Sequence, residues 1–237
     1  MFGTNDPKVH HVVQALLRDD DVFLDIGANY SAIGLLAADR VGPQGHVHLF
    51  EPQPNLCHIV KNAITEGKLE NVTLHNLMDC DGEMQLARPK RHSGMATLVN
   101  NIQQASWDTY SVQVKNIATY LPGLIKQKSL GVKIDVEGAE PVLMPWLLKQ
   151  PTLKFLVFEA ARNQKSLYQM IQESGFVLYG LEKTFFTKRL RRVDRFEEMP
   201  AYHDLVAARW ASNNLPPRKV GSYAFGRMVR DAAGARP

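Results

Sequence analysis

The chain has 237 residues, of which 45% are hydrophobic and 22% charged, and its formal net charge is +4. This length and composition are typical of a globular protein with one domain. No apolar run approaches the ~20 residues that a membrane-spanning helix needs. The first residues lack the basic start and apolar core of a signal peptide, so we expect a cytoplasmic protein. Cys57 and Cys80 have no metal-like spacing and are expected to be reduced thiols.

The first third of the chain alternates between strand and helix patterns. An amphipathic helix is predicted near the N-terminus, and three apolar strands then alternate with two helices. This β-α-β-α-β order predicts a parallel sheet with helices on both faces. The predicted helices cover 10–17, 31–40 and 55–66, and the predicted strands cover 22–26, 46–51 and 71–77.

The middle and last parts of the chain are less uniform. Residues 79–112 are predicted to be mostly a long loop, with one edge strand near its start, and a short strand and a helix follow. The alternating pattern then returns. Further strands are predicted over 131–138, 153–160, 176–181 and 202–210, helices over 139–149 and 166–175, and a solvated basic segment over 187–196.

These patterns predict an α/β fold of the Rossmann-like type, with a mostly parallel seven-stranded sheet. We divide the chain into an N-terminal helical extension (1–20), a main domain (21–211) and a basic, flexible C-terminal tail (212–237). His46 and His48 alternate along one strand and are expected at a solvated edge of the sheet.

Carboxylates follow nearly every predicted strand. In open parallel sheets ligands bind at the carboxyl ends of the strands, so these acids are expected to gather at one site. So many carboxylates at one site would repel an anionic ligand, so a site for a bare anion is disfavoured. The residues concerned are Asp25, Glu51, Asp79, Asp135, Glu137 and Glu159.

The loop after the first strand, "DIGANYS", has only the first glycine of the G-x-G-x-x-G pattern that binds a dinucleotide pyrophosphate. The acids suit a ligand with hydroxyls, an ammonium group and a cationic centre, such as S-adenosylmethionine. Glu51 would then accept hydrogen bonds from the ribose hydroxyls, and Asp25 and Gly27 would lie near the methionine end. An acid at the position of Glu51 also occurs in nicotinamide-cofactor proteins, so an NAD-dependent oxidoreductase stays open.

Five segments in order resemble the FkbM-type methyltransferases: "FLDIGANYSAIGLLAA", "HLFEPQPNLCHIVKNAI", "MDCDGE", "SGMATL" and "VKIDVEGAEPVLM". The resemblance implies a class I S-adenosylmethionine-dependent enzyme that methylates hydroxyls of sugars or secondary metabolites. It implies cofactor contacts for the residues that match the family pattern. These are Asp25, Gly27 and Asn29 in the loop, Glu51 and Pro52 after the second strand, and Asp79 after the third.

Three positions depart from the family pattern. Ser31 replaces a glycine of the cofactor loop, Ala118 replaces an aspartate, and Pro145 replaces a glycine. Ser31 is the most relevant because it belongs to the cofactor loop. We expect its hydroxyl to cap the following helix. A non-catalytic S-adenosylmethionine-binding module therefore remains an alternative to an enzyme.

For catalysis, an alcohol must lose a proton as it is methylated. Asp135 or Glu137 is predicted to accept that proton, and His92 is a further candidate for the general base. A Mg²⁺ ion held by Asp135 and Glu159 is an alternative way to activate the hydroxyl. The expected partner is a small-molecule or glycan hydroxyl, and no nucleic acid is expected because the chain lacks a "DPPY"-like motif.

Overall fold

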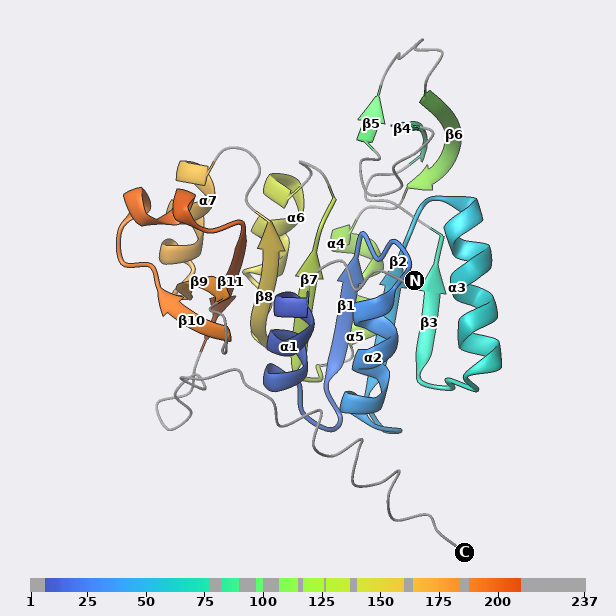
Figure 1. Ribbon diagram of the computed structural model, residues 1–237, viewed down its shortest axis with the longest axis horizontal. Coiled ribbons are helices and arrows are strands. Elements are labelled where there is room, and N and C mark those ends of the chain that lie inside the picture. Colours follow the sequence, from blue (N-terminus) through green and yellow to red (C-terminus); the bar gives the residue numbers. More distant parts are fainter. Residues whose placement is uncertain are drawn as a thin grey trace, which may run out of the picture.

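The computed structural model shows an α/β arrangement in which a central sheet is covered by helices on both faces (Figure 1). The structure describes residues 7–76, 82–89, 97–99, 107–114, 117–125, 127–136, 140–159, 164–183 and 188–209. In this part of the chain, no helix is long and apolar enough to cross a membrane.

The central sheet has eight strands in the order β10-β9-β11-β8-β7-β1-β2-β3. The five strands from β8 to β3 run parallel, and β11 runs antiparallel to both of its neighbours. The predicted, mostly parallel sheet is thus confirmed. The strands are β1 (Val22–Ile26), β2 (His46–Phe50), β3 (Val72–His75), β7 (Leu130–Ile134), β8 (Leu153–Glu159), β9 (Val177–Lys183), β10 (Lys188–Arg192) and β11 (Asp204–Ala208).

The eighth strand comes from the segment predicted to be a solvated basic stretch. β10 pairs antiparallel with β9, from Lys188 opposite Lys183 to Arg192 opposite Tyr179. Its basic side chains suit the outer edge of a sheet, where charge discourages pairing with another chain. Pairing with β9 stabilises an extended backbone that the charge pattern alone did not predict.

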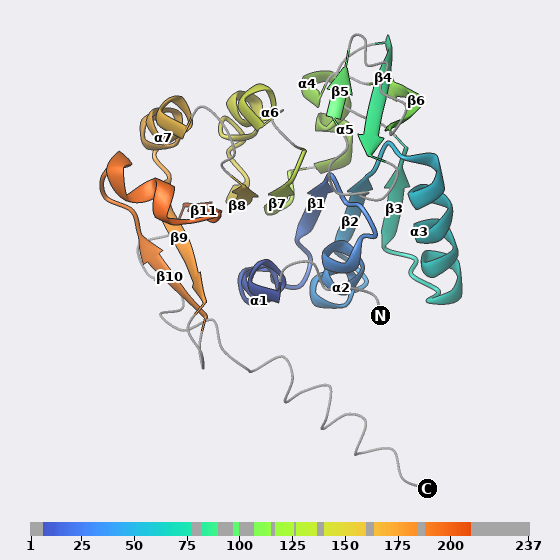
Figure 2. The same cartoon turned by 45° about the horizontal axis from the view of Figure 1, so that its top comes forward.

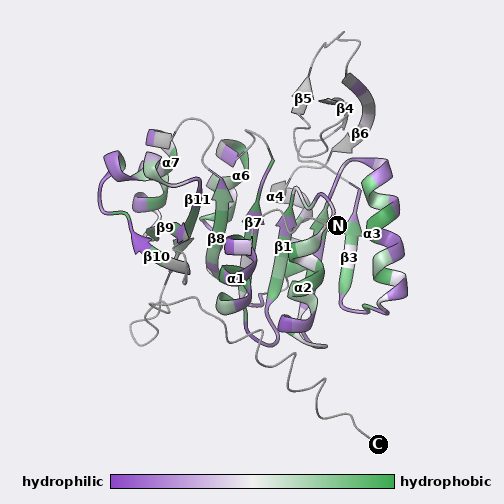
Figure 3. Ribbon diagram, viewed as in Figure 1, coloured by the Kyte–Doolittle hydropathy of each residue, from purple (hydrophilic) through white to green (hydrophobic). Residues whose placement is uncertain are grey.

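Two hydrophobic clusters fill the two faces of the sheet. The first three helices pack on one face, and helices α4 to α7 pack on the other (Figure 2). Hydrophobic residues accordingly run along the central strands (Figure 3). The helices are α1 (Pro7–Leu16), α2 (Ala32–Val41), α3 (Pro54–Glu66), α4 (Ile117–Tyr120), α5 (Pro122–Ile125), α6 (Glu140–Leu147) and α7 (Gln164–Glu173), with a 3₁₀ turn, η2 (Phe196–Ala201), before β11.

The first helix belongs to the core. Val9, Val12 and Val13 of α1 are buried in the same cluster as residues of α2 and β8. The helical spacing that predicted this element is therefore the spacing of residues packed against the sheet. The division at residues 20 and 21 remains a prediction, as does the flexible tail from 212, which lies outside the described residues.

A second, three-stranded antiparallel sheet forms where the sequence predicted mostly loop. Its order is β5-β4-β6, and the antiparallel register of β4 with β6 sets residues such as Leu86 and Tyr110 opposite each other. It lies beyond the carboxyl ends of β2 and β3 in both views (Figures 1 and 2). The predicted edge strand is therefore not an edge of the main sheet. The strands are β4 (Gly82–Pro89), β5 (Thr97–Val99) and β6 (Trp107–Val114).

The prediction that the histidines of β2 lie at a solvated sheet edge is wrong. β3 pairs outside β2, and His48 is buried. Its Nδ1 lies 3.0 Å from Nε2 of His75, whose Nδ1 lies 2.8 Å from the Tyr120 hydroxyl. Burial, together with the charge of His46, lowers the pKa of His75 to about 4.

Candidate active site

The loop between β1 and α2 is built from residues in the left-handed conformation. Gly27, Asn29 and Ser31 have φ values of 76°, 51° and 57°. Glycine adopts this conformation at little cost and asparagine adopts it more readily than most residues, whereas serine is strained there. The alternation folds five residues into a compact turn at the carboxyl end of β1.

Gly27 is required by the close approach of two chain segments. A Cβ atom at this position would lie 1.8 Å from the carbonyl oxygen of Asp135, which follows β7. The amide of Asp135 also donates to the Ile26 carbonyl over 2.9 Å. The cofactor loop and the end of β7 are thus packed backbone against backbone, and only glycine fits between them.

Glu51 fixes the loop through hydrogen bonds from backbone amides. Its Oε2 accepts a hydrogen bond from the Asn29 amide at 2.8 Å, and its Oε1 accepts one from the Gln53 amide at 2.9 Å. Burial raises the pKa of Glu51, although these hydrogen bonds act to lower it. The contact with ribose stays a prediction for Glu51. Pro52 beside it is buried, and its predicted cofactor contact is likewise untested.

Asp25 is buried and binds the start of α2 through one of its carboxylate oxygens. Its Oδ2 accepts a hydrogen bond from the Gly34 amide at 3.1 Å, and its side chain is 1% exposed. This bond satisfies an amide in the first turn of α2. A Cβ at Gly34 would meet Oδ2 at 2.9 Å, so this glycine lets the helix come close to the strand. Asp25 therefore fixes α2 on β1, in addition to the cofactor contact predicted for it.

Lys133 compensates the charge of Asp25. Its Nζ forms ion pairs with Asp25 Oδ1 at 3.1 Å and with Asp135 Oδ2 at 3.6 Å. It also donates to the Gly27 carbonyl at 2.8 Å. Burial alone lowers the pKa of this lysine, but the charges of Asp25 and Asp135 outweigh it and raise the pKa above its usual value.

Ser31 stands at the start of α2, but its hydroxyl does not cap the helix as predicted. The residue is 1% exposed, and its Oγ has no hydrogen-bond partner among the described residues. The left-handed backbone at Ser31 differs from the extended conformation that a capping serine adopts. The side chain of Asp25 supplies the acceptor for this turn instead.

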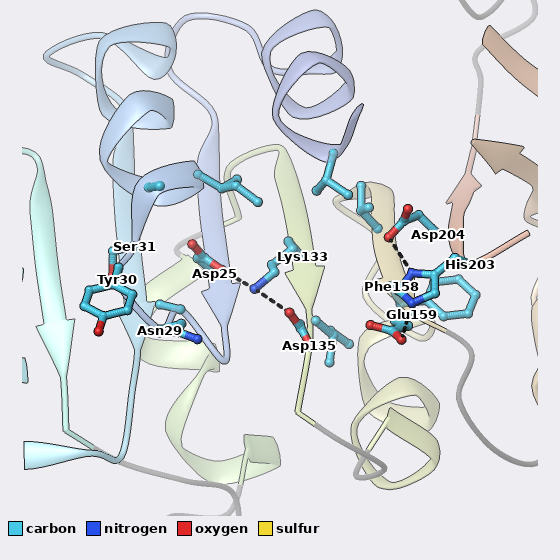
Figure 4. A pocket seen from close by; sticks show the side chains of 16 residues that line it. Asp25, Asn29, Tyr30, Ser31, Lys133, Asp135, Phe158, Glu159, His203 and Asp204 are labelled. Carbon is cyan, nitrogen blue, oxygen red and sulfur yellow. Dashed lines mark hydrogen bonds and ion pairs between the residues drawn. The ribbon is translucent and has the colours of Figure 1, made fainter. Parts of the chain in front are cut away.

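A cavity opens beside this loop at the carboxyl ends of β1, β7 and β8 (Figure 4). Four of the sequence-predicted residues line it: Asp25, Asn29, Asp135 and Glu159. The Asp135 side chain is 46% exposed and the Glu159 side chain 35%, so both carboxylates can reach a ligand. α1 and the start of β11 complete the wall with Val9, His203 and Asp204.

The methyltransferase FkbM domain family matches residues 21–185, about 70% of the chain. The chain belongs to this family. It is thus an S-adenosylmethionine-dependent methyltransferase, and its parallel sheet with β11 inserted antiparallel between β8 and β9 is the Rossmann-like fold of class I methyltransferases. The family resemblance seen in the five sequence segments is confirmed.

Several solved methyltransferase structures are distantly similar to this chain. An S-adenosylmethionine-dependent O-methyltransferase of Thermotoga maritima is 15% identical over 88% of this chain and 67% of that chain, with a TM-score of 0.49. A putative tRNA (m1A22) methyltransferase of Streptococcus pneumoniae is 13% identical over 96% and 79% of the two chains, with a TM-score of 0.47. No curated protein matches the sequence. These likenesses are too distant to indicate the acceptor, and the fold assignment rests on the strand order and the family.

The methyltransferase has two site residues that the sequence analysis did not single out, Lys133 and His203. A lysine within the apolar strand "GVKIDV" was a usable signal, because a buried lysine needs a charged partner. His203 gave no such signal, since its place in the cavity depends on how β11 pairs. Three predicted residues, Asp79, His92 and Glu137, lie outside the described part of the chain.

The predicted Mg²⁺ site has no support in the structure. The described ranges of this methyltransferase contain no group of three or more histidine, cysteine, aspartate or glutamate side chains that could hold a metal ion. Of the two predicted ligands, Glu159 has its Oε1 within 2.8 Å of the His203 ring. Asp135 lies beside the ammonium group of Lys133. Each carboxylate therefore has a partner of its own.

Proposed function

We propose that this methyltransferase transfers a methyl group to a hydroxyl of a sugar, a glycan or a small metabolite. The observation that carries the proposal is the exposed carboxylate of Asp135 on the cavity wall, with the exposed carboxylate of Glu159 at the end of the neighbouring strand β8. Carboxylates accept hydrogen bonds from hydroxyl donors. A polyhydroxylated acceptor would therefore find two carboxylate partners in this cavity.

The chemistry of the wall also suits the cofactor that the family uses. The carboxylates of Asp135 and Glu159 favour a ligand with positive charge, and Asn29 adds a polar side chain at the loop. When bound, S-adenosylmethionine supplies an electrophilic methyl group on a positively charged sulfur. We expect the loop from Gly27 to Ser31 to hold it, with Glu51 keeping that loop in shape.

Asp135 has the role of orienting the acceptor. Lys133 lies 3.6 Å from its Oδ2 and gives the carboxylate a cationic partner. Asp135 can then accept a hydrogen bond from the acceptor hydroxyl and align the hydroxyl oxygen for attack. Much of the acceleration of a methyl transfer can come from such alignment. The roles in proton transfer that were predicted for Glu137 and His92 stay predictions.

The sequence left two alternatives open. An NAD-dependent oxidoreductase has no support, because the family is one of methyltransferases. A non-catalytic S-adenosylmethionine-binding module remains testable. Asp135→Asn separates it from an enzyme, since the variant should still bind S-adenosylmethionine and lose most methyl transfer.

The direct test begins with mass spectrometry of the purified protein for co-purified cofactor and acceptor. Wild type and Asp135→Asn are then incubated with radiolabelled S-adenosylmethionine and a set of hydroxylated sugars and metabolites. Methyl transfer to a hydroxyl, lost in the variant, is the expected result. Transfer to RNA or to an amine in place of a hydroxyl, or binding of NAD without S-adenosylmethionine, would contradict the proposal.

A further inference from the structure

The pairing of β8 with β11 places an imidazole next to Glu159. Asp204, the first residue of β11, is the register partner of Glu159, the last residue of β8. Because β11 runs antiparallel, the residue before it lies at the carboxyl end of β8, where the cavity opens. His203 occupies that position, and its Nε2 lies 2.8 Å from Glu159 Oε1 (Figure 4).

The other ring nitrogen of His203 also faces a carboxylate. Nδ1 lies 3.4 Å from Asp204 Oδ1. Asp204 is itself paired with Lys8 of α1 at 2.6 Å, so much of its charge is already compensated. Glu159 is therefore the closer and stronger partner of the imidazole. The His203 side chain is 67% exposed, which lets it exchange protons with water.

This pair shares the cavity with Asp135, to which the proposed function gives the orientation of the acceptor hydroxyl. The groups closest to the imidazole are the carboxylates of Glu159 and Asp204. The charged groups that face it, or face its partners, are Glu159 on β8, Asp204 on β11, Lys8 on α1, Lys133 and Asp135 at the end of β7, and Asp25 on β1.

We infer that the Glu159–His203 pair is the general base of the methyl transfer. The hydroxyl oxygen forms a bond to the methyl carbon, the bond from that carbon to sulfur breaks, and its electron pair stays on sulfur. The hydroxyl proton passes to the pair, rests on the imidazole and leaves to water. Imidazole exchanges protons near neutral pH, which suits a general base better than an isolated carboxylate.

The inference rests on the proposed function, and its test uses the hydroxyl acceptor found in the screen. His203→Asn should lower kcat by about 10²–10⁴-fold, the usual contribution of a general base. The wild-type rate should fall at acidic pH as the general base takes up a proton, and the variant should lose this acid limb. Calorimetry should give the same affinity for S-adenosylmethionine, because His203 lies outside the cofactor loop.

His58→Asn is the matched control, because His58 is an exposed histidine on α3, away from the cavity. It should leave the rate and its pH profile unchanged. If His203→Asn keeps the wild-type rate and acid limb, the inference is wrong and the proposed function stands. If His203→Asn loses cofactor binding or its folded structure, the histidine is structural and the inference fails. If the wild type methylates no hydroxyl, both proposals fail.

Discussion

Asp25 and Lys133 are direct neighbours across β1 and β7: their Cα atoms are partners in the register, and Lys133 Nζ lies 3.1 Å from Asp25 Oδ1. Both side chains point to the face of the sheet that α2 covers, between strands that are otherwise apolar. The pair thereby joins the start of α2, through Gly34, to the end of β7, through Asp135. Two walls of the cavity depend on one buried ion pair.

Removing the cation from this pair should be costly. Lys133→Met leaves Asp25 charged and buried without compensation, and we expect a loss of about 3–5 kcal/mol in the free energy of unfolding. Urea denaturation measures it. The double variant Asp25→Asn/Lys133→Met removes both charges and should recover part of the loss. A loss below about 1 kcal/mol for the single variant would show that water compensates Asp25.

Gly27→Ala tests the contact between the loop and β7. A Cβ here would lie 1.8 Å from the Asp135 carbonyl oxygen, so one segment must move. We expect a loss of at least about 3 kcal/mol and weaker binding of S-adenosylmethionine, from the clash together with the left-handed backbone. Gly175→Ala is the control, because its φ is 74° but no atom lies within 4 Å of the added Cβ. Equal losses in the two variants would exclude the clash as the cause.

Ser31→Gly should stabilise the protein. The change removes a left-handed serine and a buried hydroxyl without a partner among the described residues, together worth about 1–2 kcal/mol. Thermal unfolding measures the gain. Calorimetry should show cofactor binding at least as tight as in the wild type. Lys68→Gly is the comparison, because Lys68 is left-handed but exposed and should gain less. A destabilised Ser31→Gly would mean that the serine has a partner outside the described residues.

His75 should make the fold sensitive to acid. Its pKa is lowered to about 4, so the unfolded chain binds a proton between about pH 6.5 and 4 that the folded chain does not. Stability is then complete above pH 6.5 and falls as the pH drops to about 4, by an amount on the order of 1–3 kcal/mol. Urea unfolding of wild type and His75→Gln across this range should show a flatter dependence in the variant.

Two comparisons separate the contribution of His75 to the pH dependence from the contributions of other groups. Glu51 acts in the opposite direction, because its raised pKa makes its buried charge a cost that shrinks as the pH falls. The difference between wild type and variant removes that contribution. His58→Gln changes an exposed histidine and should follow the wild-type curve. Parallel curves for wild type and His75→Gln would rule out the buried imidazole as the source.

The alternation of β1, α2, β2, α3 and β3 was readable from the sequence because each of these elements buries its own apolar face against a neighbour close in the chain. The small sheet was not, since β4 and β6 pair across a long intervening segment. The same holds for β10, whose basic residues resemble a solvated stretch until β9 pairs with them. Local patterns predict elements, but pairing between distant segments depends on the assembled chain.

The sequence by itself determined the family, the order of the elements and the acids at the strand ends, because motif residues and hydrophobic periodicity are local properties. Only the tertiary structure decided which contacts the acids among the described residues make. Asp25 caps α2 and pairs with Lys133, Glu51 holds the loop, and Asp135 faces the cavity. The place of His203 beside Glu159 follows from the antiparallel register of β11, which long-range backbone hydrogen bonding sets and the residues near His203 do not encode.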